Sequence, residues 1–232
     1  CYVPSVLHMK QDEWKNYILV KRNMPLILAK ELSKKRKGVV GISTVTDAYQ
    51  PIEKKYQVTR YCLEQLLKYD FPIQIQTKSD LVLRDIDLFT RFSKAEVMMS
   101  IGTFNEQDRQ TLEPHTSSLK KRIQVLEEIK DIKKLKTSVF LGPLYPNMTW
   151  KKTKELLDRL LDIKISSILI DNFHLKPGLQ EQINSILPKD ESLTSGFNEN
   201  VFNSSNWFQR ISNDIKQYVE KHSTDIKVKD AF

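Results

Sequence analysis

Short apolar runs alternate with amphipathic helical segments along most of the chain. The periodicity predicts strands at 17–21, 39–45, 73–77, 96–101, 137–141 and 166–170. Helices are expected at 25–37, 52–69, 81–92, 117–133, 151–162 and 207–222. This alternation predicts an α/β fold with a parallel sheet and right-handed crossovers, either as an open sheet or as a partial barrel.

The C-terminal part of the chain has a weaker pattern. Residues 179–205 are rich in Ser, Asn and Gly, which predicts a loop-rich closure, and residues 223–232 are expected to form a frayed tail. We therefore predict a core at 1–178 and a C-terminal extension at 179–232, loop-rich and helical, packed on that core.

Polar residues follow the central strands at the point where each strand ends. The five longer strands are expected to end at Val45, Thr77, Ile101, Leu141 and Asp171. Parallel α/β folds carry their sites at the carboxyl ends of the strands. The candidate residues there are Thr44, Thr46, Asp47, Lys78, Ser100 and Gly142, with Asn172, His174 and Lys176 ranked lower.

Composition narrows the class of protein. The chain has 232 residues, of which 40% are hydrophobic and 28% charged, as in ordinary globular domains. No apolar run reaches the length of a membrane span, and the start of the chain does not resemble a secretory signal. The two cysteines, Cys1 and Cys62, make no disulfide framework, which points to a reducing cytoplasm. An initial Cys in place of Met predicts that the sequence begins inside a longer protein.

The net charge of +8 leaves two interpretations open. A basic surface is suited to phosphate neutralisation, and it is also typical of a lysine-rich solvated surface. The alternative function is a non-enzymatic basic nucleic-acid-binding protein, which predicts aromatic residues interleaved with Lys and Arg on a strand face. The basic residues here fall mainly on predicted helices and loops. A phosphate-binding barrel enzyme would need a glycine-rich loop, and the chain has only six glycines.

Several separated segments resemble one family. TDAYQPIEKKYQVTR at 46–60 is similar to the TDPYQPIEKKYRLTR signature of radical S-adenosylmethionine (SAM) proteins related to spore photoproduct lyase, often labelled DNA-repair photolyase-like. CYVPSVLH at 1–8 resembles the end of that family's CxxxCxYCYxxxxxH motif. TKS at 77–79 and GPLYP at 142–146 also match, so the resemblance extends over 1–178.

The resemblance implies a partial parallel (β/α) barrel of the radical SAM type, with the first strand missing from this sequence. It implies a [4Fe–4S] cluster and SAM as cofactors. Reductive cleavage of SAM would give a 5′-deoxyadenosyl radical that acts on an unknown substrate, which the family label suggests is a nucleic acid. Cys1 would be the third cluster ligand, and the other two cysteines would lie upstream. The fragment by itself is therefore expected to be inactive.

The same resemblance implies roles for single residues. Thr46 and Asp47 would meet the amino group of SAM, although both residues are also suited to capping the next helix. Lys78 would pair with the SAM carboxylate, or else be an ordinary solvated lysine. Ser100 would meet the ribose hydroxyls, or be a satisfied strand serine. Gly142 would let a backbone approach the ligand closely.

The family also implies lyase-like chemistry in the full-length protein. Val45 occupies the position of the hydrogen-donating cysteine of spore photoproduct lyase, so the resemblance extends to radical generation and not to photoproduct repair. An electron donor such as a ferredoxin or flavodoxin is expected. We further expect a cytoplasmic monomer with no membrane partner.

Overall fold

The structure is a computed structural model that describes residue 3 and residues 16–42, 45–146, 149–175, 179–187, 192–202 and 206–231. The predictions made for Cys1, Thr44 and Lys176 lie outside these residues.

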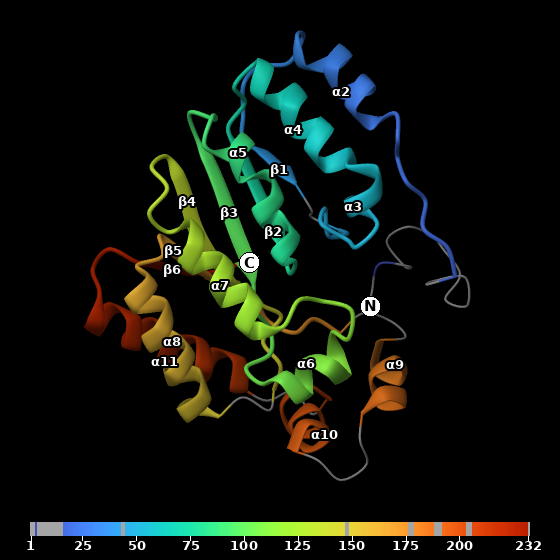
Figure 1. The fold of residues 1–232 in the computed structure, drawn as a ribbon. Helices are drawn as coiled ribbons and strands as arrows, with labels where there is room; N and C mark the ends of the chain where they lie inside the picture. The colour runs from blue at the N-terminus through green and yellow to red at the C-terminus, as the bar shows by residue number, and fades with distance from the viewer. Residues whose placement is uncertain are drawn as a thin grey trace. The chain divides into compact units, whose positions relative to one another are not determined.

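The described strands form one parallel sheet with the order β1-β2-β3-β4-β5-β6 (Figure 1). Their bounds are β1 (Val40–Ile42), β2 (Ile73–Thr77), β3 (Ala95–Ser100), β4 (Leu135–Leu141), β5 (Ser167–Ile170) and β6 (Lys227–Asp230). Val40 is paired with Ile73 in the β1–β2 register, and Val139 with Ile168 in the β4–β5 register. The predicted α/β fold with a parallel sheet is confirmed.

The chain divides into two compact units. The first unit contains residues 1–97 and 132–135, and the second contains residues 98–131 and 136–232. In the first unit the helical segments are α2 (Met24–Leu32), α3 (Glu53–Tyr56), α4 (Val58–Lys68), the 3-10 helix η1 (Asp80–Asp85) and α5 (Ile86–Phe89). Helices α2 and α4 lie side by side (Figure 1), and α4 buries Leu63 and Leu66.

The single helix predicted at 52–69 is two helices. Gln57 has a left-handed backbone, with φ of 51°, and separates α3 from α4. Glu53 Oε1 accepts hydrogen bonds from the amides of Thr59 and Arg60 at 3.0 and 3.4 Å, which caps the start of α4. The apolar periodicity continues through this break, so the pattern alone does not reveal it. The helix predicted at 81–92 is likewise η1 followed by α5.

The strand predicted at 17–21 is wrong. These residues are not in a strand, and Tyr17, Ile18 and Leu19 are exposed by 50%, 60% and 79%. An apolar run forms a strand only where a neighbouring strand supplies backbone partners. In the described part of the chain, no strand pairs with this segment.

The second unit has the predicted strand–helix alternation. Its helices are α6 (Glu106–Leu112), α7 (Leu119–Ile129), α8 (Trp150–Ile163), α9 (Leu179–Ile186), α10 (Ser192–Phe197) and α11 (Trp207–His222). Ser118 and Thr149 cap α7 and α8, each accepting a hydrogen bond from the third helical residue. Of the described helices none is both long and apolar enough to cross a membrane; α11, the longest, has 16 residues.

The predicted frayed tail is also wrong. Residues Lys227–Asp230 form β6, which pairs in parallel with β5, and the Ala231 amide donates to the Ile170 carbonyl at 2.7 Å. Asp230 accepts a hydrogen bond from the Ser212 hydroxyl of α11 at 2.6 Å. The segment is too short and too polar to show an apolar strand pattern. Its strand forms because β5 supplies backbone partners and α11 supplies a side-chain hydrogen bond.

The segment predicted as a loop-rich closure contains α9, α10 and the π-helix η2 (Asn198–Phe202) (Figure 1). Its apolar residues form one buried cluster with Tyr145 from the loop after β4: Leu179, Ile183, Leu193 and Phe197. These helices are short, so their periodicity is weak, and burial against the core stabilises them.

Candidate functional site

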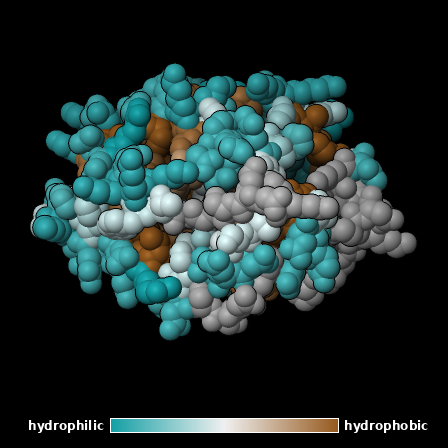
Figure 2. Space-filling model, turned by 90° about the horizontal axis from the view of Figure 1, so that it is seen from below, coloured by the Kyte–Doolittle hydropathy of each residue, from teal (hydrophilic) through white to brown (hydrophobic). Residues whose placement is uncertain are grey.

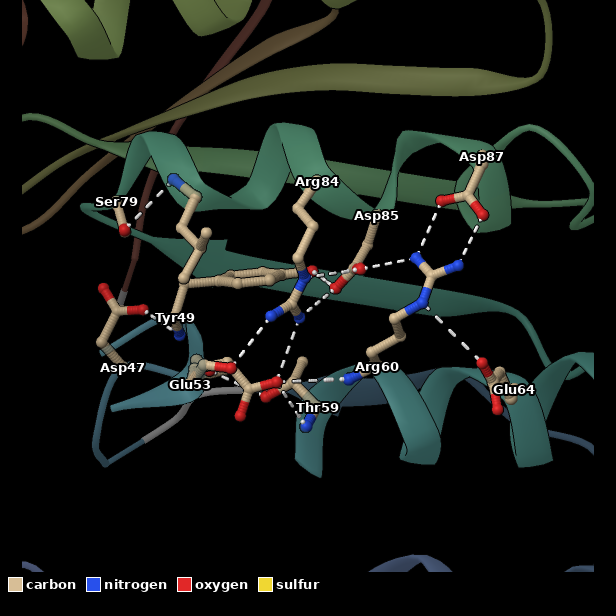
Figure 3. Close-up of polar contacts among 12 residues, drawn as sticks. Asp47, Tyr49, Glu53, Thr59, Arg60, Glu64, Ser79, Arg84, Asp85 and Asp87 are labelled. Carbon is tan, nitrogen blue, oxygen red and sulfur yellow. Dashed lines mark hydrogen bonds and ion pairs between the residues drawn. The ribbon is translucent and has the colours of Figure 1, made fainter. Parts of the chain in front are cut away.

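In the first unit, Asp47 connects the turn after β1 to the end of β2. Its carboxylate accepts hydrogen bonds from the amide of Tyr49 at 2.8 Å, the hydroxyl of Thr77 at 2.7 Å and the amide of Lys78 at 2.8 Å (Figure 3). The helix-capping interpretation is wrong, because α3 begins after Ile52 and has no side-chain cap. Asp47 instead fixes the backbone from which the Lys78 side chain extends.

The residues on both sides of Lys78, Thr77 and Ser79, also make hydrogen bonds that fix the backbone. Thr77 is buried and its hydroxyl accepts the Ser79 amide at 3.0 Å, while Ser79 caps η1 by accepting the Leu81 amide at 3.3 Å. The side chain of Lys78 is half-buried. Thr46, next to Asp47, is exposed. The structure therefore joins Asp47 and Lys78, the two charged candidates of this unit, through the hydrogen bond from the Lys78 amide to the Asp47 carboxylate.

A network of charged side chains lies beside this strand end, and the sequence analysis did not predict it. Arg84 donates to Glu53 at 3.0 Å and to Asp85 at 2.7 Å, and Arg60 binds Asp87 through two nitrogens (Figure 3). Hydrogen bonds to Asp87 and, second, to Asp85 raise the pKa of Arg60, and a hydrogen bond to Asp85 raises that of Arg84. The charged RDID run at 84–87 could have indicated such a network, but its partners Glu53 and Arg60 are remote in sequence.

In the second unit, Ser100 ends β3 and is buried, with 3% of its surface exposed. Its carbonyl accepts a hydrogen bond from Arg122 at 3.0 Å. Arg122 is itself buried and pairs with Glu113 at 2.7 Å. The burial favours the interpretation of Ser100 as a satisfied strand serine, and its contact with a ribose stays a prediction.

Gly142 is tightly surrounded by its own chain. A Cβ at this position would lie 2.6 Å from the Cβ of Asp171 and 2.7 Å from Cε1 of Phe140. Gly102 is similar, since a Cβ there would lie 2.8 Å from the Pro143 carbonyl oxygen. Internal packing is thus sufficient to explain the glycine at 142, and the close approach of a ligand stays a prediction.

The residues after β5 lie at the surface of the second unit. Asp171 is half-buried, and its carboxylate lies 3.4 Å from Nε2 of His174, which is exposed. Burial raises the pKa of Asp171, and the nearby His174 partly opposes this rise. Asn172 accepts the amide of Phe173 at 2.8 Å, so its side-chain oxygen is used locally. Phe173 packs with Tyr145 and Phe197 in an aromatic cluster.

The predicted cluster ligand, Cys1, is not among the described residues. Within those residues, no group of three or more His, Cys, Asp or Glu side chains is arranged to hold a metal ion. Burial raises the pKa of the Cys62 thiol to about 11, so this cysteine stays protonated at neutral pH.

No family model matches the chain. Two relatives are similar in sequence. An uncharacterized protein of Methanocaldococcus jannaschii is 38% identical over 136 residues, or 59% of this chain and 51% of that protein. An uncharacterized protein of the Acidianus two-tailed virus is 30% identical over 184 residues, or 76% of this chain and 60% of that protein. The chain thus spans little more than half the length of these relatives.

Solved structures of SuiB from Streptococcus suis are similar in fold. The SAM-bound structure superposes with a TM-score of 0.62 at 11% identity, over 94% of this chain and 45% of SuiB. The structure bound to the precursor peptide SuiA gives a TM-score of 0.58 at 10% identity, over 92% of this chain and 43% of SuiB. The likeness decides between the open sheet and the partial barrel: the chain has a partial-barrel fold, as SuiB has.

Proposed function

We propose that the chain is the SAM-binding barrel of a radical SAM enzyme related to spore photoproduct lyase. The fold shared with SAM-bound SuiB supports this proposal, as do the TDAYQPIE, TKS and GPLYP segments in family order. The observation that carries it is the Asp47 carboxylate, which holds the Lys78 amide at the end of β2. A cation on a fixed backbone at the carboxyl end of a central strand is suited to an anionic ligand group.

In this proposal Lys78 binds the carboxylate of SAM. Thr46, exposed beside Asp47, is left to contact the amino group, because Asp47 already accepts hydrogen bonds from its own chain.

The residues of this chain do not supply a full cluster site. The family's [4Fe–4S] cluster needs three cysteine thiolates, whereas the chain contains two cysteines in all. In the proposed enzyme, Cys1 would act with further cysteines from outside these 232 residues. We also propose that the full-length enzyme carries out lyase-like chemistry and receives electrons from a ferredoxin or flavodoxin.

A nucleic acid is the substrate class that we propose to test first. The net charge of +8 supports it, and the face drawn in Figure 2 is mainly hydrophilic, with hydrophobic residues in small separate patches. Binding of a labelled oligonucleotide should weaken steeply as salt is added, because phosphate neutralisation releases counterions. Failure to bind at low salt would exclude this class.

The test of SAM binding is a substitution at Lys78. A charge-assisted hydrogen bond contributes about 1.5–3 kcal/mol, so Lys78→Met should weaken SAM binding roughly ten- to a hundredfold. The measurement is calorimetric titration of the chain with SAM. Lys151→Met, at an exposed position in α8, is the matched control and should leave the affinity unchanged. Equal affinities of wild type and Lys78→Met would refute the role of Lys78, and no binding by the wild type would refute the proposed function.

A further inference from the structure

Asp85 is a fully buried carboxylate at the end of η1, with 0% of its surface exposed. Oδ1 accepts hydrogen bonds from Arg60 at 2.8 Å and from Nε of Arg84 at 2.9 Å. Oδ2 accepts from Nη2 of Arg84 at 2.7 Å and from the hydroxyl of Tyr49 at 3.1 Å (Figure 3). A carboxylate has about four acceptor positions, so these partners occupy them and Asp85 is not itself a ligand-binding group.

Tyr49 joins this buried carboxylate to the strand end. Its ring is buried, with 1% of the residue exposed, and the guanidinium carbon of Arg84 lies 5.8 Å from the ring centre. The hydroxyl at one end of the residue donates to Asp85, and the amide at the other end donates to Asp47. Burial and the negative charge of Asp85 raise the pKa of Tyr49, so the phenol keeps its proton. One rigid side chain therefore spans the distance between the two carboxylates.

Asp47 carries the connection to Lys78. The oxygen that accepts the Tyr49 amide also accepts the Thr77 hydroxyl, and the other oxygen accepts the Lys78 amide. A continuous chain of contacts, all within the first unit, thus runs from Asp85 through Tyr49 and Asp47 to Lys78. We propose that Tyr49 and Asp85 are positioning residues that set the place of Lys78 for the amino-acid part of SAM. This inference rests on the proposed function.

The ordinary interpretation is that the network only stabilises the unit, by joining α3 and α4 to η1. Both interpretations predict lower stability when a partner is removed, so stability alone does not distinguish them. Positioning makes two further predictions. The amides bound by Asp47 should open more often when the Tyr49 hydroxyl is lost, and binding should weaken only for ligands that carry the amino-acid group.

Tyr49→Phe is the variant of choice. It removes one hydroxyl and keeps the buried ring, the Asp47 contact and both arginines on Asp85. Asp85→Asn would leave arginine donors facing an amide nitrogen, so it should destabilise the unit more than Tyr49→Phe does. Tyr218→Phe is the matched control, because the Tyr218 hydroxyl also donates to an aspartate, Asp158, but at the surface of the second unit.

The first measurement is amide hydrogen exchange by NMR and needs no ligand. In Tyr49→Phe, exchange at the amides of residue 49 and Lys78 should be on the order of ten- to a hundredfold faster. This ratio corresponds to the free energy that a hydrogen bond to a charged group contributes. Amides of β4 and β5, such as those of Val139 and Leu169, should exchange at the wild-type rate. Unchanged exchange at Lys78, or an equal rise in every strand, would overturn the inference.

The second measurement compares two ligands. SAM should bind roughly tenfold more weakly to Tyr49→Phe, as is typical when a supporting partner of a binding group is lost. 5′-Methylthioadenosine, which lacks the amino-acid group, should bind wild type and variant equally. An equal loss for both ligands would show a merely structural role. If wild type binds no SAM, the proposed function fails, and the exchange rates still decide whether Tyr49 holds Lys78.

Discussion

Replacing Gly142 with alanine tests whether this glycine is required by the protein's own packing. The new methyl group would lie 2.6 Å from the Cβ of Asp171 and 2.7 Å from the ring of Phe140. Both distances are well below van der Waals contact. The Phe140 ring is half-buried and belongs to a side chain that can change rotamer, whereas the Asp171 Cβ is fixed to the backbone. Its backbone is held on both sides, by Leu141 at 3.0 Å and Leu144 at 3.0 Å.

Overpacking of this kind costs about 1–3 kcal/mol of unfolding free energy. For a chain of this size, each kcal/mol lowers the melting temperature by roughly 2–4 °C. Urea denaturation without any ligand is the assay, with Gly41→Ala as the control, because a Cβ at Gly41 would meet nothing within 4 Å. The control should stay within about 1 kcal/mol of wild type. A Gly142→Ala midpoint equal to that of wild type would refute the packing explanation and leave ligand approach as the reason for the glycine.

Two further predictions concern buried charge in the second unit. Arg122→Met should lower the unfolding free energy by roughly 3–5 kcal/mol in urea denaturation, since it leaves Glu113 buried without its cation. The control, Arg159→Met at the exposed pair with Glu127, should cost less than about 1 kcal/mol. Similar losses in the two variants would contradict the burial argument. Burial raises the pKa of Asp171 above its unfolded value of 3.8, so the native state binds the proton more tightly and loses stability as pH rises from 3.8 through the folded pKa. Asp171→Asn should therefore gain stability relative to wild type across that window in thermal melts, and a pH-independent difference would show that the carboxyl does not titrate abnormally.

The sequence by itself determined the strand–helix order and the parallel sheet. The alternating IQIQT at 73–77 and the TSVFL segment at 137–141 indicate strands, and the helical patterns that follow them indicate parallel connections. The caps at Ser118 and Thr149 follow from local chemistry, because a hydroxyl before an amphipathic run binds the free amides of the first turn. Polar residues that directly follow a strand, such as Asp47 and Lys78, could also be recognised from the local sequence.

The tertiary structure decided which of these residues act together. Asp47 proved to bind the end of β2 and not the next helix, since its partners Thr77 and Lys78 lie thirty residues away along the chain and adjacent across the sheet. The polar strand β6 and the apolar segment 17–21 were both mispredicted, because a strand needs a partner and periodicity does not record one. Buried groups such as Asp85 and Arg122 look like surface charges in the sequence. Only folding brings together the opposite charges and hydrogen bonds that make their burial tolerable.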